Sequence, residues 1–412
     1  MQQSLSVLVC APPGTGKTSG IVIPTLLSAR HSFIVHDPKG EICDITAAFR
    51  QTFSSIIIID PASEHSAIFN VFDTAMLPEP LKRRAYITNI AEIIIPIPPH
   101  ANNYFETAAR NTFIFFAEWM VWDAERKGES SSIPQIASKI VSEADLGKLI
   151  REMAKEENLP AIIKEDANSV LIAAGAEKQW AGVIGTLSAQ LDIFRDPLIA
   201  GALKGRSSFL ASTLRKQSTT IYIKVRDEDR NRLSPIIKLI LSVINNSLLS
   251  TMPAEKDKMV TFIIDEFPRL GRMDTIIDLP ALGRGYRVNA VFIAQDINQI
   301  KKRYSNEDIK ILFSTCSYKV IFRQGEYDTA KTVSELIGKY TSEKRSTSHD
   351  TKTPLSNRSS ESLSDEGLLL VSPQDILNLE KDKCLIIAQG FSRLPFKAGV
   401  AFWYKGRLMK TA

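Results

Sequence analysis

Residues 11–18 (APPGTGKT) constrain the fold most strongly, because they match a phosphate-binding loop in the sequence setting that such a loop requires. They follow the Walker A pattern, with Ala11 in place of its first glycine. An apolar run, LSVLVC, precedes them and a helical pattern, SGIVIPTLLSAR, follows, which predicts a strand, the loop and a helix. Glycines let the backbone wrap around a phosphate, and the helix N-terminus adds partial positive charge there.

Two residues of this loop have individual predicted roles. The Lys17 ammonium is expected to reach the β- and γ-phosphates of ATP, and the Thr18 hydroxyl to bind Mg²⁺. The other predicted nucleotide contacts are Pro13, Gly14, Thr15, Gly16 and Ser19. The alternative is a Gly/Pro turn that ends in Lys-Thr by chance, and the flanking strand and helix argue against it. Pro24 falls inside the expected helix and predicts a kink there.

An acidic pair, Asp265-Glu266, ends the apolar run VTFII. This is the Walker B position, where Asp265 is expected to hold Mg²⁺ through water and Glu266 to orient and deprotonate the attacking water. Gln295 ends the next apolar run, VNAVFIA, and its amide is suited to sense the γ-phosphate. The alternative for each is an ordinary polar residue at a strand end.

The alternation of strands and helices predicts an α/β fold with a mostly parallel sheet. Short β-branched runs recur in 1–74 and 213–412, whereas 75–212 reads as helical and strand-poor. We therefore expect a discontinuous nucleotide-binding domain with an all-α domain inserted in it. The loop is spelled like that of AAA+ ATPases, but their acidic pair follows much sooner. The long helical region in between favours a RecA-like P-loop NTPase.

Two segments near the C-terminus carry further expectations. Residues 341–366 are rich in serine and threonine with scattered charges, which predicts a mobile loop, because such a segment buries little apolar surface. Residues 400–404 (VAFWY) form a short apolar run and are expected to be a strand.

Arg284 and Arg287 precede the strand that ends at Gln295. An arginine there is placed to reach the γ-phosphate of a neighbouring subunit, and Arg284 is the preferred candidate for such a trans-acting finger. The alternative is a solvated arginine, or one paired with Asp274 or Asp278. A finger supplied in trans requires a homo-oligomer, and a closed ring supplies every site.

Composition adds few constraints to these motifs. The 412 residues carry a net charge of +5, which permits an anionic partner without demanding one. The four cysteines lie far apart with no CxxC, which favours a reducing compartment over a disulfide scaffold or zinc site. We expect no membrane helix, because no apolar run approaches the roughly 18 residues that such a helix needs, and the N-terminus does not fit a signal peptide.

Several longer stretches resemble one family, the type IV secretion coupling proteins of the TraG/TraD class of conjugation ATPases. They are GKTSGIVIPTLL, HDPKGEICDITAAFR, YFETAARNTF, FIIDEFPRLGRMDTI, GYRVNAVFIAQDINQI and SPQDILNLEKDKCLII, and they run along nearly the whole chain. DPKGE and DEFPRLG are more specific to this family than the phosphate loop is. Family members usually begin with membrane helices, and none is recognised here, so the resemblance is to the cytoplasmic part without its anchor.

The resemblance implies a RecA-like ATPase with an inserted all-α domain that faces the cytoplasm and engages cargo. It also implies a hexamer at the cytoplasmic face of the bacterial inner membrane. With other type IV secretion components, the hexamer would drive single-stranded DNA bound to its relaxase, or protein effectors, into the channel. By the same likeness, Asp37 and Glu41 of DPKGE lie near the nucleotide and order the Mg²⁺ shell or the subunit interface. The alternative for them is a capped helix start.

Two other functions remain open at this point. One is a double-stranded DNA motor of the FtsK/HerA kind, and the other is a docking module without catalysis. DNA contacts are marked only by three basic clusters, for which solvated surface charge is the alternative. The clusters are Lys204, Arg206, Arg215 and Lys216; Lys301, Lys302 and Arg303; and Lys405, Arg407 and Lys410.

Overall fold

The computed structural model describes residues 5–98, 103–349, 359–391 and 394–406. The chain divides into two compact units. The first unit consists of residues 29–265 and 273–289, and the second of residues 5–28, 266–272 and 290 onward. Each unit is built from segments far apart in the sequence.

The first unit contains four parallel strands in the order β5-β2-β4-β3. They are β2 (Ser32–Asp37), β3 (Ser55–Ile59), β4 (Thr219–Lys224) and β5 (Val260–Ile264). Strands β2 and β5 are buried along their whole length, which is why they read as continuous apolar runs. Strands from both sides of the helical region thus pair with one another, as β3 does with β4.

Helices in the first unit accompany these strands. They are α2 (Glu41–Gln51), α10 (Arg230–Leu249), α11 (Asp274–Ile277) and α12 (Leu279–Leu282). Among the described residues, α10 alone is long and apolar enough to cross a membrane, which the sequence analysis did not recognise. Because 61% of that stretch is buried inside the protein, α10 packs as a core helix.

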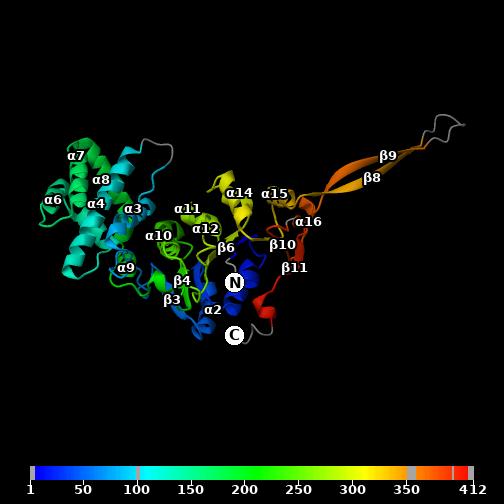
Figure 1. The fold of residues 1–412 in the computed structure, drawn as a ribbon, viewed down its shortest axis with the longest axis horizontal. Coiled ribbons are helices and arrows are strands. Elements are labelled where there is room, and N and C mark those ends of the chain that lie inside the picture. Colours follow the sequence, from blue (N-terminus) through cyan, green and yellow to red (C-terminus); the bar gives the residue numbers. More distant parts are fainter. Residues whose placement is uncertain (1–4, 99–102, 350–358, 392–393, 407–412) are drawn as a thin grey trace. The chain divides into compact units, whose positions relative to one another are not determined.

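The chain between β3 and β4 forms a helical region (Figure 1). Its helices are α3 (Pro80–Ile94), α4 (Tyr104–Lys127), α5 (Ile133–Ser142), α6 (Leu146–Met153), α7 (Ala161–Ala174), α8 (Glu177–Leu191) and α9 (Pro197–Leu203). Helix α4 packs against α3, α7 and α8 and fully buries Phe113, Phe115 and Phe116. Each such phenylalanine contributes roughly 1.5–3 kcal/mol through its burial. The predicted division into an inserted and a discontinuous domain remains a prediction.

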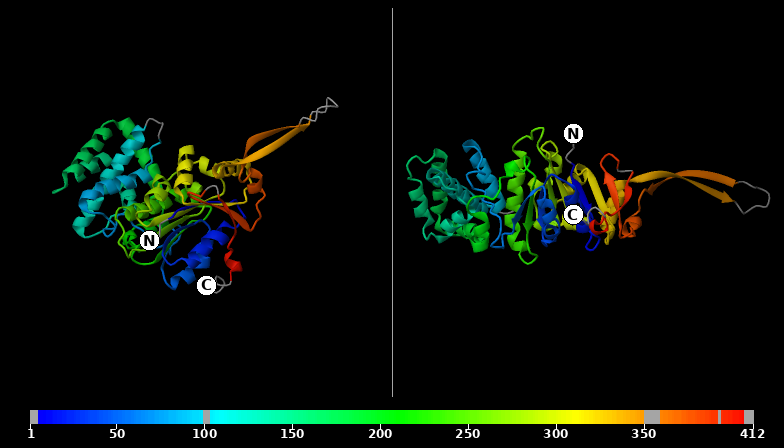
Figure 2. Two further views of the ribbon diagram at one scale, coloured as in Figure 1. Left: turned by 45° about the vertical axis from the view of Figure 1, so that its right-hand side comes forward. Right: turned by 90° about the horizontal axis from the view of Figure 1, so that it is seen from below.

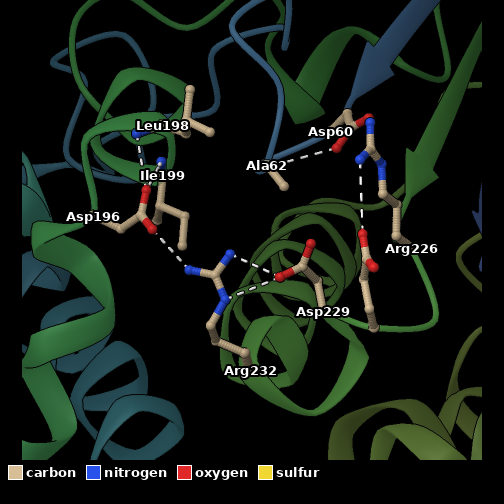
Figure 3. Close-up of polar contacts among 9 residues, drawn as sticks. Asp60, Ala62, Asp196, Leu198, Ile199, Arg226, Asp229 and Arg232 are labelled. Carbon is tan, nitrogen blue, oxygen red and sulfur yellow. Dashed lines mark hydrogen bonds and ion pairs between the residues drawn. The ribbon is translucent and has the colours of Figure 1, made fainter.

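The chain enters and leaves the helical region at neighbouring points. The Ser208 N–H donates to the Ile68 carbonyl (2.9 Å), and the Asn70 N–H donates to the Ser207 hydroxyl (3.0 Å). An ion-pair cluster lies near the departing end (Figure 3). Arg232 of α10 bonds Asp229 (2.8 Å) and Asp196 (2.7 Å), and Asp196 caps α9. Arg232 and Asp196 line a hollow of about 500 Å³.

The second unit contains strands in the order β11-β10-β7-β1-β6. They are β1 (Val7–Cys10), β6 (Val288–Ala294, which begins in the first unit), β7 (Tyr318–Phe322), β10 (Lys383–Ala388) and β11 (Phe396–Gly399). Strand β1 runs parallel to β6 and β7, whereas β10 runs antiparallel to β7 and β11. The predicted mostly parallel sheet is confirmed.

Short helices complete the second unit. They are a π-helix at Thr18–Val22, α1 (Ile23–Ser28), a 3₁₀ turn at Phe267–Leu270, α13 (Ile297–Lys301), α14 (Asn306–Thr315), α15 (Tyr327–Ile337), α16 (Pro373–Leu377) and a 3₁₀ turn at Trp403–Lys405.

Two predicted C-terminal segments differ from the structure. Residues 400–404 are not a strand: the edge strand β11 ends at Gly399, and Trp403–Lys405 forms a 3₁₀ turn. Within 341–366, strands β8 (Lys339–His349) and β9 (Ser359–Leu369) pair as an antiparallel ribbon (Figure 2). The predicted loop is wrong over these strands, because ladder hydrogen bonds can order a polar segment that lacks an apolar pattern. Residues 350–358 lie outside the described part.

Candidate nucleotide-binding site

The predicted phosphate loop is a tight turn at the end of β1. The Ala11 N–H donates to the Ala294 carbonyl (2.9 Å), and the Thr15 hydroxyl donates to the Pro12 carbonyl (2.7 Å). Gly14 and Gly16 have φ angles of 74° and 87°, which strain residues with a side chain. The turn therefore depends on the two glycines that the sequence marked.

The helix after the loop begins as a wider turn. The Ile23 N–H bonds the Thr18 carbonyl five residues back, and the ordinary helix α1 starts at Ile23. Pro24 is the second residue of α1, directly after this π-helical turn. A π-turn shifts the hydrogen-bond register, so Pro24 lies where the pattern changes. The predicted kink at Pro24 stays a prediction.

Glu266 is the centre of a polar cluster in the second unit. Its carboxylate lies 3.5 Å from the Lys17 ammonium and 2.9 Å from the Arg269 guanidinium. The Gln295 amide donates to Glu266 Oε1 (3.1 Å), and the Gln299 amide donates to Gln295 Oε1 (2.8 Å). The structure thus brings together three predicted residues: Lys17, Glu266 and Gln295.

Glu266 also has an unusual backbone. Its φ of 54° and ψ of 39° are left-handed, a conformation that costs a non-glycine residue about 1–3 kcal/mol. Its side chain is only 13% exposed. Backbone strain at a largely buried acidic residue is typical of functional sites.

Asp37 and Asp265 lie in the first unit, at the same edge of its strands. His36 of β2 pairs with Ile264 of β5, so the two aspartates follow at the carboxyl ends of neighbouring parallel strands. The His36 Nδ1 bonds the Asp265 carbonyl (2.8 Å), and Asp265 is buried. Adjacent parallel strands therefore deliver both carboxylates to one edge.

Asp37 has a structural partner. Its Oδ2 accepts the Cys43 N–H (2.8 Å), at the start of α2. Burial raises the pKa of Asp37, while the backbone N–H groups of residues 39, 40, 42 and 43 oppose that rise. Gly40, with a φ of 75°, turns the loop, and Glu41 is exposed on the first residue of α2. This geometry matches the capped helix start for Asp37 and leaves Glu41 facing solvent.

The two arginines before β6 differ in their surroundings. Arg287 has a φ of 55° and donates to the carbonyls of Glu255 (2.8 Å) and Asp257, which fixes a loop of its own unit. Arg284 is exposed. Of the predicted basic clusters, Arg215 is buried and donates to the Thr251 carbonyl (2.8 Å), so it is structural. Arg407 and Lys410 lie outside the described residues.

Sequence reasoning missed residues that touch the loop from the C-terminus. A Cβ on Gly16 would lie 2.5 Å from the Phe402 ring, and a Cβ on Gly20 would overlap Val400 Cγ1. Arg269 and Gln299 were also not singled out as site residues. Their only signals are spacings of three and four residues from Glu266 and Gln295, which are common in any chain.

Residues 3–412 match the family described as Type IV secretory system Conjugative DNA transfer. The protein VirD4 of Rhizobium radiobacter is 26% identical over 98% of this chain, which covers 57% of that relative. The conjugal transfer protein TraG of Escherichia coli is 26% identical over 81% of this chain and 55% of its own length. The chain thus spans a little over half of the curated relatives it matches.

A solved structure has the same fold. The plasmid coupling protein TrwB, in complex with ADP and Mg²⁺, matches with a TM-score of 0.70 at 17% identity. The match covers 96% of this chain and 85% of that chain. At this level of identity the likeness establishes the fold alone.

Proposed function

Because the chain belongs to the type IV secretory system conjugative DNA transfer family, we propose that it is the ATP-hydrolysing part of a coupling protein. The observation that carries the proposal is the Lys17–Glu266–Gln295 cluster beside a glycine-dependent loop. Phosphoryl transfer to water needs a cation that binds the phosphates and a carboxylate that deprotonates the water. Lys17 and Glu266 supply these groups, and the Gln295 amide contacts the carboxylate.

We assign each part a role. Lys17 binds the β- and γ-phosphates, and Pro13, Gly14, Thr15, Gly16 and Ser19 complete the cradle. Thr18 and Asp265 hold Mg²⁺, which neutralises charge on the phosphate oxygens when bound. Glu266 orients and deprotonates the attacking water, and Gln295 senses the γ-phosphate. Asp37 and Glu41 help to order the Mg²⁺ shell or the interface with a neighbouring subunit, and the exposure of Glu41 to solvent favours the interface for that residue.

The donor set fits a triphosphate. A Cβ added to Gly14 would meet no described atom within 4 Å, so there is open space beside this glycine. The Lys17 side chain is 14% exposed and already faces a carboxylate. Phosphate oxygens would compete with Glu266 for this ammonium, and the exchange would release Glu266 to act on water.

The wider function is proposed from the family. A homo-oligomer, a hexamer at the cytoplasmic face of the bacterial inner membrane, would move its cargo into the secretion channel with other type IV secretion components. The cargo is single-stranded DNA with its relaxase, or protein effectors. The sheet and loop also suit an FtsK/HerA-like motor, which stimulation by double-stranded rather than single-stranded DNA would reveal.

Two substitutions test the enzyme. Lys17→Ala should weaken ATP binding about ten- to a hundredfold, because a charge-assisted contact is lost. Glu266→Gln should bind ATP normally and hydrolyse it about 10²- to 10⁴-fold more slowly. Binding is measured by calorimetry and turnover by phosphate release, with and without single-stranded DNA.

The matched control is Lys178→Ala, an exposed lysine on α8, which should behave as the wild type. Wild-type turnover in both site variants would reject catalysis at this cluster. Nucleotide binding without any turnover in the wild type, with or without DNA, would favour the docking module.

A further inference from the structure

The phosphate loop of the second unit has a neighbour from the far end of the chain. We call residues Val400–Lys405 the aromatic segment. The Val400 N–H donates to the Asp382 carbonyl (2.8 Å), which ties the segment to the start of β10. From there the Phe402 ring lies over Gly16, and Val400 packs on Gly20. Gly16 therefore accommodates this segment as well as the turn, and Gly20 leaves room for Val400.

The aromatic rings of the segment form a small stack. Phe402 and Tyr404 lie 5.5 Å apart at 24°, and the Lys405 ammonium is 5.0 Å from the Phe402 ring centre. Tyr404 is 45% exposed, and Phe402 is only partly buried. Neither ring is sealed inside the core of the unit. Here stacked rings stay accessible next to a phosphate loop.

A nucleoside triphosphate carries its base at a short tether from the phosphates. Its base must therefore rest on groups next to the loop, and the described groups that contact Gly16 and Gly20 include Phe402 and Val400. Every nucleobase has a π-face that stacks on an aromatic ring, whatever hydrogen-bonding groups line its edge.

We propose that Phe402, supported by Tyr404, is the platform on which the base of the bound nucleotide stacks. This inference rests on the proposed function, because it needs a nucleotide on the loop. A stacking platform gains affinity from the base without reading its edge. Adenine and guanine nucleotides should therefore both benefit, and a triphosphate without a base should not.

The test compares ATP, GTP and inorganic tripolyphosphate by calorimetry. In Phe402→Ala, ATP and GTP should bind roughly 5- to 150-fold more weakly, while tripolyphosphate affinity stays unchanged. Phe402→Trp should keep the preference for ATP over tripolyphosphate. Phe396→Ala is the matched control, because Phe396 is 58% exposed on β11 of the same unit.

Other outcomes overturn the platform. Equal losses for tripolyphosphate and ATP would mean that Phe402 supports the loop, and tighter binding of all three would mean that it covers the site. Equal ATP affinity in variant and wild type would show that the base rests elsewhere. A wild type that binds neither ATP nor tripolyphosphate would overturn the proposed function itself, which sets that failure apart.

Discussion

At the scale of single residues, Arg50 at the end of α2 is the largest fully buried side chain in the described part of the protein. Its guanidinium donates to Thr220 Oγ1 (2.6 Å) and to the carbonyls of Ala29 and His31 (2.8 Å each). It also lies 4.6 Å from the centre of the Phe33 ring. Burial lowers the pKa of Arg50 to about 10, so it stays charged at neutral pH and fixes the start of β2.

This arrangement makes His31 a source of acid sensitivity. Burial, and secondarily the Arg50 charge, lowers the pKa of His31 from 6.5 to about 4. Because the folded-state pKa of His31 lies below the unfolded value, stability is greatest above pH 6.5 and falls progressively as the pH drops from 6.5 to 4. When the pH is lowered from 7.5 to 5, protonation linked to His31 should lower the free energy of unfolding by roughly 1–2 kcal/mol.

The measurement is the urea midpoint of unfolding at both pH values. His31→Gln can keep a hydrogen bond to Thr261, which His31 contacts at 2.8 Å, and should show a smaller pH dependence than the wild type. His65→Gln, at an exposed position, is the control and should keep the wild-type dependence. Equal slopes in all three proteins would contradict the prediction.

The strongest residue predictions came from motifs whose spacing carries their chemistry. Lys17, Glu266 and Gln295 were predicted separately, and the structure places them within one cluster. Arg269 was missed because an acidic and a basic residue three apart occur on many surfaces. The left-handed backbone of Glu266 could not be predicted either. In a sequence only a glycine indicates such a conformation, because it adopts a positive φ without steric cost.

At the scale of elements, the aromatic segment and the turn after the phosphate loop should depend on each other. Gly20→Ala would place a Cβ against Val400 Cγ1, and overpacking of this kind costs about 1–3 kcal/mol. In the double variant Gly20→Ala/Val400→Ala the nearest contact becomes Val400 Cβ at 3.7 Å. Thermal unfolding should therefore show a loss in the single variant and a recovery in the double.

Gly185→Ala on α8 is the control for this pair. A Cβ there would meet no described atom within 4 Å, and alanine favours a helix, so stability should hold or rise. A double variant no more stable than Gly20→Ala would show that Val400 is not the obstacle.

Elements whose apolar residues recur in a clear pattern were predicted well, and elements without such a pattern were not. Buried parallel strands such as β2 and β5 appear as apolar runs because both faces are covered. The run at 400–404 looked the same, but its apolar side chains pack on glycines of the loop, and no sheet partner is required. The ribbon β8–β9 lacks an apolar face in sequence and was taken for a loop.

At the scale of the whole molecule, catalysis by a ring requires that each active site receive an arginine from the neighbouring subunit. Arg284→Ala should keep ATP affinity but lose the part of the ATPase rate that rises with protein concentration. A finger in trans contributes about 10³- to 10⁵-fold to turnover. Turnover measured across a range of protein concentrations checks this.

Arg151→Ala, at an exposed position on α6, serves as the control. Full activity of Arg284→Ala at every concentration would remove it as a finger. The hexameric ring itself stays a prediction, because ring size is set by surfaces between subunits, and no pattern along a single chain encodes their geometry.

The neighbouring ends of the helical region have a consequence for how such proteins diversify. Because Ile68 and Ser208 are hydrogen-bonded to each other, and β3 and β4 pair directly, the sheet would close over the gap if the helices were exchanged. The helical region is thus an insertion between two paired strands, and its replacement leaves the register of β3 and β4 unchanged. Recombination between relatives could therefore exchange these helices while β3 and β4 keep their pairing.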